Sequence, residues 1–256
     1  MLISVIQSDL AWEDKLLNFS KLGRLIEPLN QKTDIVILPE MFNTGFSMNP
    51  DHLGESPEDE TFNWMKNIAL NGNFGVCGSY IIKEGNHFYN RWLFVSPENE
   101  IWYYNKRHLF SMGGEDKVFT PGNKRLVFTF RGVRISPFIC YDLRFPVFSR
   151  NRNDTDLLIY AANWPESRSE VWKTLLRARA IENQCYTAGV NRTGTDGEGI
   201  KYCGDSMIIN PLGVVIKSCN QNTECSITTE ISLTALSEER AKFPVLGQSD
   251  DFMIKL

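Results

Sequence analysis

Apolar and polar positions alternate along this chain with two different periods. Between residues 12 and 29, apolar side chains recur every three or four positions, which predicts a helix with one buried face. The same spacing predicts helices over residues 61–70, 169–183 and 233–242. Short apolar runs bounded by polar or turn-forming residues predict strands. These runs are residues 2–8, 34–38, 74–82, 90–96, 100–105, 126–130, 133–139, 157–162, 185–190, 206–210, 214–217 and 225–231.

Turn signals join some of these strands into hairpins. Pro97-Glu98-Asn99, Arg131-Gly132 and Pro211-Leu212-Gly213 each separate two strand runs by a few residues. Hairpin strands are antiparallel, whereas parallel neighbours need a crossover that is usually a helix. The order of elements therefore predicts an α/β fold with mixed sheets rather than a purely parallel sheet. No shift in composition and no long linker divides the 256 residues, so we expect one domain.

Composition narrows the class of partner. Hydrophobic residues make up 42% of the chain, which supports a sizeable core, and the formal net charge is -4. A mildly acidic chain is poorly matched to nucleic acid or to an anionic membrane. No apolar run approaches the ~20 residues that cross a bilayer, and the first residues read as a strand without the features of a signal peptide. We expect a cytoplasmic protein with no nucleic-acid or membrane partner.

The cysteines and histidines argue against a metal site. The six cysteines lack Cys-x-x-Cys spacing, and none of the three histidines lies near a cysteine in the sequence. We therefore expect no metal and no organic cofactor. Scattered cysteines fit a reducing cytoplasm, and all but Cys140 are interpreted as packing residues in or beside strands. These are Cys77, Cys185, Cys203, Cys219 and Cys225.

Three polar side chains follow the ends of predicted strands. Glu40 follows the run 34–38, Cys140 follows 133–139, and Asn163 follows 157–162. In α/β folds, ligand sites gather at the carboxyl ends of the strands. We therefore expect these three residues to meet at one edge of a sheet.

Cys140 needs a base before it can act as a nucleophile. A thiol has an ordinary pKa of ~8.5 and reacts as the thiolate. Histidine is the usual base, and His108 is the only histidine near a plausible site. A partly buried carboxylate can serve instead, because burial raises the pKa of a carboxyl group. Glu40 follows a proline and an apolar strand, so partial burial of this residue is expected.

Lys106 lies in a basic cluster and could stabilise an oxyanion while favouring a nearby thiolate. Each of these residues also has an ordinary structural interpretation. Cys140 could be a small buried hydrophobe, Glu40 a solvated turn residue and Lys106 a surface lysine. The individual positions therefore leave the function open.

Taken jointly, the motifs resemble the nitrilase superfamily of carbon–nitrogen hydrolases, which is defined by a Glu-Lys-Cys triad. Order and spacing hold over residues 1–245. The matching segments are Leu38-Pro39-Glu40-Met41-Phe42, Tyr104-Asn105-Lys106-Arg107-His108-Leu109-Phe110, Phe119-Thr120-Pro121-Gly122, Ile139-Cys140-Tyr141-Asp142-Leu143-Arg144-Phe145-Pro146, Ala161-Ala162-Asn163-Trp164-Pro165, residues 177–183 and Gly204-Asp205-Ser206. The resemblance implies a single-domain αββα sandwich, with two mixed β-sheets flanked by helices, and a C-terminal tail over 246–256.

The branch with the greatest resemblance is that of the YafV-like omega-amidases. Lys106-Arg107-His108-Leu109-Phe110 and the tail Lys242-Phe243-Pro244 are among the shared features. Members carry a second glutamate before the Thr-Pro-Gly turn, and Glu115 occupies that place. The loop is shorter than in some relatives, which leaves Asp116 as the alternative to Glu115.

The resemblance implies a role for each site residue. Glu40 would be the base, Cys140 the nucleophile that forms a thioester, and Lys106 would hold the oxyanion with the backbone N–H of Tyr141. Glu115 would orient Lys106 or the amide nitrogen. The implied substrates are short dicarboxylic mono-amides, such as 2-oxoglutaramate and 2-oxosuccinamate.

The free carboxylate of such substrates needs a cation or donors in the pocket. Arg144 and Arg168 are candidates, although a structural salt bridge is the favoured interpretation of Arg144. Trp164 and Phe42 could be pocket walls or core residues, and Asn163 could be a pocket donor.

Three other functions compete with this one. A nitrilase, carbamoylase or other amidase would share the triad and differ only in the pocket. A non-catalytic binding protein on the same fold would have no need of all three triad residues. A papain-like Cys-His hydrolase would have to use His108, and no signature of that family surrounds it. Resemblance also implies a homodimer in which the tail crosses to the neighbouring subunit.

Overall fold

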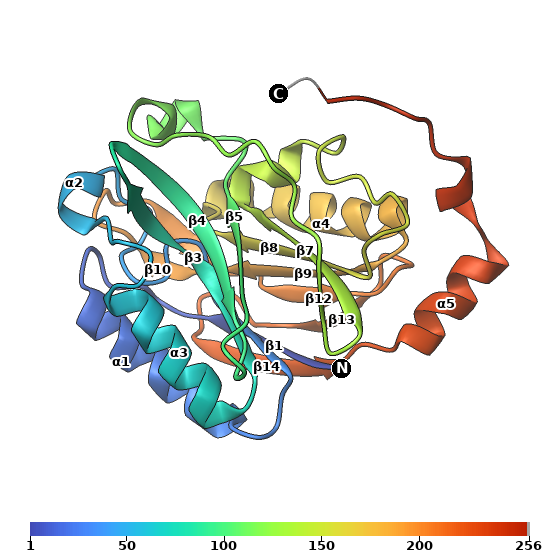
Figure 1. Cartoon of the computed structure of the whole chain (residues 1–256), viewed down its shortest axis with the longest axis horizontal. Coiled ribbons are helices and arrows are strands. Elements are labelled where there is room, and N and C mark those ends of the chain that lie inside the picture. Colours follow the sequence, from blue (N-terminus) through green and yellow to red (C-terminus); the bar gives the residue numbers. More distant parts are fainter. Residues whose placement is uncertain (255–256) are drawn as a thin grey trace.

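Two six-stranded sheets pack face to face in a computed structural model that describes residues 1–254 (Figure 1). The first sheet has the strand order β14-β1-β2-β3-β4-β5. Its strands are β14 Cys225–Glu230, β1 Leu2–Gln7, β2 Ile35–Ile37, β3 Gly75–Glu84, β4 His87–Val95 and β5 Ile101–Asn105. The second sheet has the order β13-β12-β9-β8-β7-β6. Its strands are β13 Val215–Ser218, β12 Met207–Ile209, β9 Tyr186–Asn191, β8 Leu157–Ala162, β7 Val133–Ile139 and β6 Phe128–Phe130.

Helices cover the outer faces of the two sheets. In Figure 1, α1 and α3 lie together on one side of the sandwich and α4 lies on the other. The helices are α1 Lys15–Ile26, α2 Pro50–Leu53, α3 Glu60–Gly72, α4 Ser169–Asn183 and α5 Leu233–Lys242. Each sheet is mixed, because β1-β2-β3 and β7-β8-β9 are parallel while the outer strands are antiparallel. The αββα sandwich implied by the resemblance is confirmed.

Strand alternation builds the two sides of the core. In β2, Ile35 and Ile37 face the core between the sheets, whereas Val36 faces the core under α1 and α3. All three side chains are fully buried. A strand buried on both faces reads as a continuous apolar run, which is why the run 34–38 lacks alternation.

Some element boundaries differ from the predicted ones. The first helix begins at Lys15, because the side chain of Asp14 caps it by accepting from the backbone N–H of Leu17. Strand β3 continues to Glu84 and turns at Gly85, where φ is +58°, into β4. Two elements were not predicted from the sequence, namely α2 and a small hairpin of β10 Thr193–Thr195 with β11 Lys201–Cys203.

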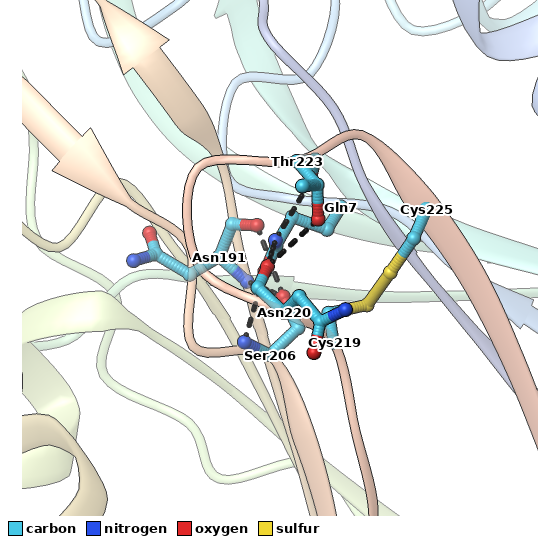
Figure 2. The surroundings of a disulfide bond; sticks show 7 residues. All are labelled: Gln7, Asn191, Ser206, Cys219, Asn220, Thr223 and Cys225. Atoms are coloured by element: carbon cyan, nitrogen blue, oxygen red, sulfur yellow. Dashed lines mark hydrogen bonds between the residues drawn. A yellow bond between two sulfur atoms is a disulfide. The ribbon is translucent and has the colours of Figure 1, made fainter.

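A disulfide corrects the interpretation of two cysteines. Cys219 follows β13 of the second sheet and Cys225 begins β14 of the first, and their sulfurs are bonded (Figure 2). The amide nitrogen of Gln7, from β1, donates to the carbonyls of Asn220 and Thr223 inside the closed loop. The packing interpretation was wrong for this pair, because the end of β13 and the start of β14 lie side by side. Cys77, Cys185 and Cys203 are buried free thiols, as packing residues should be.

The C-terminal tail leaves α5 as an irregular segment on the outside of the molecule (Figure 1). Phe243 and Met253 are 69% and 89% exposed. The dimer role expected for residues 246–256 stays a prediction, and positions 255 and 256 of that tail lie outside the described residues. Across residues 1–254, helices are too short or too polar to cross a membrane.

Candidate active site

The strand ends bring the candidate residues together from both sheets. Glu40 follows β2 in the first sheet, whereas Cys140 and Asn163 follow β7 and β8 in the second. The expectation of one sheet edge was therefore wrong in detail. The parallel centres of the two facing sheets end at the same end of the sandwich, so the carboxylate of Glu40 reaches the backbone N–H of Asn163 at 2.8 Å.

Cys140 occupies a sharp turn between β7 and a 3₁₀ turn over Cys140–Arg144. Its φ is +44°, in the left-handed region that a side chain with a Cβ adopts at a cost. Asp142 holds the turn closed. One of its carboxylate oxygens accepts from the backbone N–H of Ile139 at 2.9 Å and from the hydroxyl of Tyr104 at 2.8 Å. The turn presents the half-buried Cys140 thiol at the end of a rigid strand.

Lys106 is the centre of a buried ionic cluster. Its Nζ donates to Glu40 Oε1 at 2.8 Å and to the two carboxylate oxygens of Glu115 at 3.0 and 2.9 Å. The three side chains are 0% exposed. Burial by itself would lower the pKa of Lys106, but the carboxylates of Glu115 and Glu40 outweigh burial and raise it. The lysine is therefore held as the charged ammonium.

Glu115 is the second acid that contacts Lys106. The backbone N–H of Phe110 donates to its Oε2 at 2.6 Å. Burial raises the pKa of Glu115, and the nearby Glu40 carboxylate raises it further against the opposing effect of Lys106. Asp116 is exposed. The structure thus places Glu115, and not Asp116, at the lysine.

Asn163 buttresses Glu40 from the second sheet. Besides the backbone contact, its Nδ2 donates to the carbonyl oxygen of Glu40 at 2.6 Å. The neighbouring Trp164 is held by Asn191, which exchanges hydrogen bonds with both backbone groups of the tryptophan at 2.8 and 3.0 Å. The loop after β8 is therefore held by Glu40 on one side and by Asn191 on the other.

The electrostatics around Cys140 keep its proton on the sulfur. Burial raises the pKa of the Cys140 thiol well above its ordinary value, and the negative charge of Glu40 raises it further. Lys106 opposes these effects without cancelling them. A nucleophile of this kind is activated by transferring its proton to an adjacent base as it attacks.

A cavity of about 800 Å³ opens over Cys140. Tyr141, Asn163, Trp164, Arg144 and Arg168 all line it. The other lining residues are Trp12, Glu13, Phe46, Ser47, Met48, Asn49, Phe110, Met112, Gly113, Pro165, Asp196, Glu198, Ile200 and Tyr202. Glu40, Lys106 and Glu115 do not line the cavity and are buried behind its wall. Cys140 is the residue of the wall that lies next to this ionic cluster.

Phe42 does not line the cavity. It is fully buried in the core under α1 and α3, with its ring centroid 5.7 Å from that of Trp64 and 6.2 Å from that of Tyr80. The pocket-wall role was wrong, because the chain turns after Glu40 and directs the phenylalanine to the helical side of the sheet. Trp164, by contrast, is a cavity wall.

The two candidate arginines keep their charges available to the cavity. Arg144 lies with its guanidinium carbon 5.3 Å from the centre of the Trp164 ring, and that of Arg168 is 5.4 Å from the Phe110 ring. Within residues 1–254 neither arginine forms an ion pair with a carboxylate. The salt bridge favoured for Arg144 is absent because its side chain points outward from the 3₁₀ turn.

His108 supports the nucleophile turn. Its Nδ1 lies 2.7 Å from Asp142 Oδ1, and its ring stacks on Phe145 with the centroids 3.8 Å apart. A Cys-His hydrolase would need the His108 ring beside the Cys140 sulfur. Here the group that acts on the pKa of the Cys140 thiol is the carboxylate of Glu40.

Sequence reasoning missed two buried residues of the site. Asn90 donates to both Glu40 and Glu115, and Asp142 ties the turn of Cys140 to the segment that carries Lys106. Asn90 could have been found from the sequence, because it is a polar residue shortly before the apolar run of β4. An acid two positions after the nucleophile was the signal for Asp142. In the part of the chain that the structure describes, no three His, Cys, Asp or Glu side chains gather as a metal site would require.

Comparisons with known proteins define the class. The family model described as Carbon-nitrogen hydrolase matches residues 2–241. The chain is 43% identical over 252 residues to Omega-amidase YafV of Escherichia coli (strain K12), with 98% of each chain covered. It is 34% identical over 248 residues to a 2-oxoglutaramate amidase of Bacillus subtilis (strain 168), with 95% of each covered.

Solved structures agree with this assignment. XC1258 from Xanthomonas campestris, a CN-hydrolase superfamily protein with an arsenic adduct in the active site, is 41% identical with a TM-score of 0.97. The alignment covers 100% of this chain and 99% of that one. The protein belongs to the carbon–nitrogen hydrolase family and is therefore a hydrolase of carbon–nitrogen bonds. Within this nitrilase superfamily it falls in the YafV-like branch.

Proposed function

We propose that this protein is an omega-amidase that hydrolyses the terminal amide of short dicarboxylic mono-amides, such as 2-oxoglutaramate and 2-oxosuccinamate. The observation that carries the proposal is the cavity over Cys140, which has a buried Glu40-Lys106-Glu115 cluster beneath it and two arginines without acidic partners in its wall. The amide end would lie at the thiol, and the free carboxylate would face a guanidinium. The names of the relatives with 43% and 34% identity support the same substrate class.

The first step forms a carbon–sulfur bond. Glu40 accepts the thiol proton while Cys140 Sγ attacks the amide carbonyl carbon. The carbonyl oxygen becomes an oxyanion held by Lys106 and by the backbone N–H of Tyr141. The two oxygens of Glu115 can share one proton of the lysine, which leaves another ammonium proton for the oxyanion. Glu115 thus orients the lysine.

The second half of the cycle returns the proton. Glu40 protonates the departing nitrogen and the carbon–nitrogen bond breaks. Ammonia is released, and the acyl group remains on Cys140 as a thioester. Glu40 then takes a proton from water, and the hydroxide adds to the thioester carbon. Collapse of this adduct breaks the carbon–sulfur bond and releases the acid, and Glu40 returns its proton to the sulfur to restore the thiol. Division of one hard step into two easier ones is the advantage of covalent catalysis.

A substrate panel tests this proposal. Ammonia release should show a kcat/KM for 2-oxoglutaramate that exceeds that for glutamine by about tenfold or more, because discrimination depends on the groups at the far end of the pocket. N-carbamoyl amino acids and simple nitriles should be poorer substrates. Cys140→Ala should lower kcat by about 10⁴-fold or more, whereas Cys185→Ala, at a buried thiol outside the cavity, should remain active. Preference for a nitrile or a carbamoyl compound would overturn the omega-amidase assignment within the same family.

The location and assembly also remain proposals. A cytoplasmic location is proposed from the scattered cysteines and the strand-like first residues, whereas the disulfide Cys219–Cys225 is of the kind that persists in an oxidising compartment. A homodimer that uses the C-terminal tail is supported by the exposed apolar side chains of that segment.

A further inference from the structure

Asn90 lies between the two acids of the buried cluster. It is fully buried in β4, and its Nδ2 donates to Glu40 Oε1 at 2.8 Å and to Glu115 Oε1 at 3.1 Å. Lys106 Nζ donates to the same two oxygens at 2.8 and 3.0 Å. Four hydrogen bonds therefore form a closed cycle, in which two nitrogens, from Asn90 and Lys106, each donate to the same two carboxylate oxygens.

The orientation of the Asn90 amide is set by the acids. Both protons of Nδ2 are used on carboxylates, while Oδ1 has no hydrogen-bond partner among residues 1–254. A buried acceptor without a partner costs free energy, so such a group needs an explanation. The reversed amide would place Oδ1 against two carboxylate oxygens. The residue is held in the orientation that serves Glu40 and Glu115, although its own carbonyl stays unpaired.

The charge balance explains why two donors are needed. Two carboxylates and one ammonium leave one excess negative charge in a site without solvent exposure. The titratable and charged groups around the Asn90 amide are Glu40 after β2, Lys106 after β5, Glu115 in the loop that follows, and Cys140 beyond them after β7. A hydrogen bond donated to an ionised carboxylate favours the charged form. Lys106 donates one proton to Glu40 and one to Glu115 and keeps its third for the oxyanion, so a second hydrogen bond to each acid has to come from another donor.

We propose that Asn90 is a positioning residue of the amidase site, which holds Glu40 and Glu115 at a fixed separation and keeps the carboxylate of Glu40 aimed at the thiol. The inference rests on the proposed function for its chemistry. Asn90 does not line the cavity, so it acts on turnover through Glu40 and leaves substrate binding to other residues.

Two substitutions with opposite pH signatures test this. Asn90→Leu has a similar shape and removes both hydrogen-bond donors. Loss of these donors favours the protonated forms of Glu40 and Glu115, so the acidic limb of the pH profile of kcat/KM should move up by about one pH unit. Asn90→Asp is isosteric, and its carboxyl can donate only while it is protonated. The activity of Asn90→Asp relative to the native enzyme should therefore fall as pH rises. Both variants should lose about 10- to 100-fold in kcat near neutral pH with little change in KM.

A matched control separates positioning from folding. Asn151 is also buried, and its Nδ2 donates to the carbonyls of Thr155 and Asn183, away from the cavity. Asn151→Leu should lower the melting temperature and leave the shape of the pH profile unchanged. If Asn90→Leu fails to fold, the isosteric Asn90→Asp carries the test.

Alkylation of Cys140 by iodoacetamide, measured against pH without substrate, makes the result independent of the substrate class. Its pH dependence should shift in Asn90→Leu and not in Asn151→Leu. A uniform loss of kcat at every pH in both Asn90 variants, with unchanged alkylation profiles, would overturn the positioning role. Failure of the substrate panel alone would change the substrate and leave this inference standing.

Discussion

The Cys140 thiol is kept neutral by its surroundings, which sets the order of chemical events at the site. Burial and the Glu40 charge raise its pKa, so a standing thiolate is disfavoured. A neutral thiol beside a buried carboxylate resists adventitious oxidation and alkylation, because the thiolate is the reactive form. In the proposed mechanism, a substrate carbonyl draws the sulfur electrons as Glu40 takes the proton. In the same proposed mechanism, the positive charge of the Lys106 ammonium stabilises the oxyanion that forms.

The turn of Cys140 shows how local strain is offset. A left-handed φ for a residue with a Cβ costs of the order of 1–3 kcal/mol. The carboxylate of Asp142 repays this by accepting from Ile139, Tyr104 and His108. Each hydrogen bond to a charged group contributes about 1.5–3 kcal/mol. The strained geometry persists because the surrounding network determines it several times over.

Arg168 is predicted to bind the substrate carboxylate. Arg168→Ala should raise KM for 2-oxoglutaramate about tenfold or more, because a charge-assisted hydrogen bond to the carboxylate is lost. The effect on a neutral amide of similar length should be small. Steady-state kinetics on both substrates measures the difference, and Arg168→Lys should recover part of the loss. Equal effects on the two substrates would exclude the carboxylate role and direct attention to Arg144.

At the level of elements, the residues of the candidate site follow the ends of strands rather than lying on helices. β2, β5, β7 and β8 each stop at the same end of the sandwich, and the next few residues carry Glu40, Lys106, Cys140 and Asn163. Because strands in a packed sheet move little, side chains at their ends are placed with small error. Loop residues such as Glu115 then have to be fixed by additional contacts, here from Phe110, Lys106 and Asn90.

The disulfide is predicted to stabilise the edge where β13 meets β14. Its removal in Cys219→Ser/Cys225→Ser should lower the free energy of unfolding by about 2 kcal/mol, the value for closing a loop this short in the unfolded chain. Urea unfolding measures the change. Reductant should lower the stability of the native protein by a similar amount and leave the double variant unaffected. A native protein that is insensitive to reductant would show that the bond contributes nothing to stability.

At the level of the whole molecule, the packing of the two sheets against each other sets the distance between the residues that each sheet contributes to the site. Each sheet carries part of the candidate site, and the core between the sheets holds the two parts in register. The hydrogen bonds between Glu40 and Asn163 cross from the first sheet to the second. Any change that loosens the packing between the sheets should therefore reduce turnover before it unfolds the chain.

The tail is predicted to strap two subunits together. The full chain should behave in light scattering as a dimer, at twice the chain mass of 29.3 kDa. Deletion of residues 246–256 should shift it toward the monomer, since the exposed Met253 is removed. The truncated chain retains the contact of Gln184 Nε2 with the Phe243 carbonyl, so α5 stays attached. A truncated dimer would show that the interface lies elsewhere, and a monomeric full chain would exclude the homodimer.

Much of the fold follows from local patterns. The predicted strands before Glu40, Cys140 and Asn163 all exist, as does each predicted helix, because periodic burial and turn residues act over a few positions. The Glu-Lys-Cys assignment came from motifs that are each contiguous in sequence. Boundaries were less accurate where a cap or a turn decided them, as at Asp14 and Gly85.

Local patterns in the sequence indicated which side chains could do chemistry and which strand each would follow. The tertiary structure decided which of them meet. Glu40 and Asn163 are 123 positions apart and belong to different sheets, so no local pattern could place one against the other. The same reason explains the errors at Phe42, Arg144 and the cysteine pair, and the omission of Asn90. Burial periodicity reports that a face is covered, whereas the identity of the covering residue depends on how the two sheets pack.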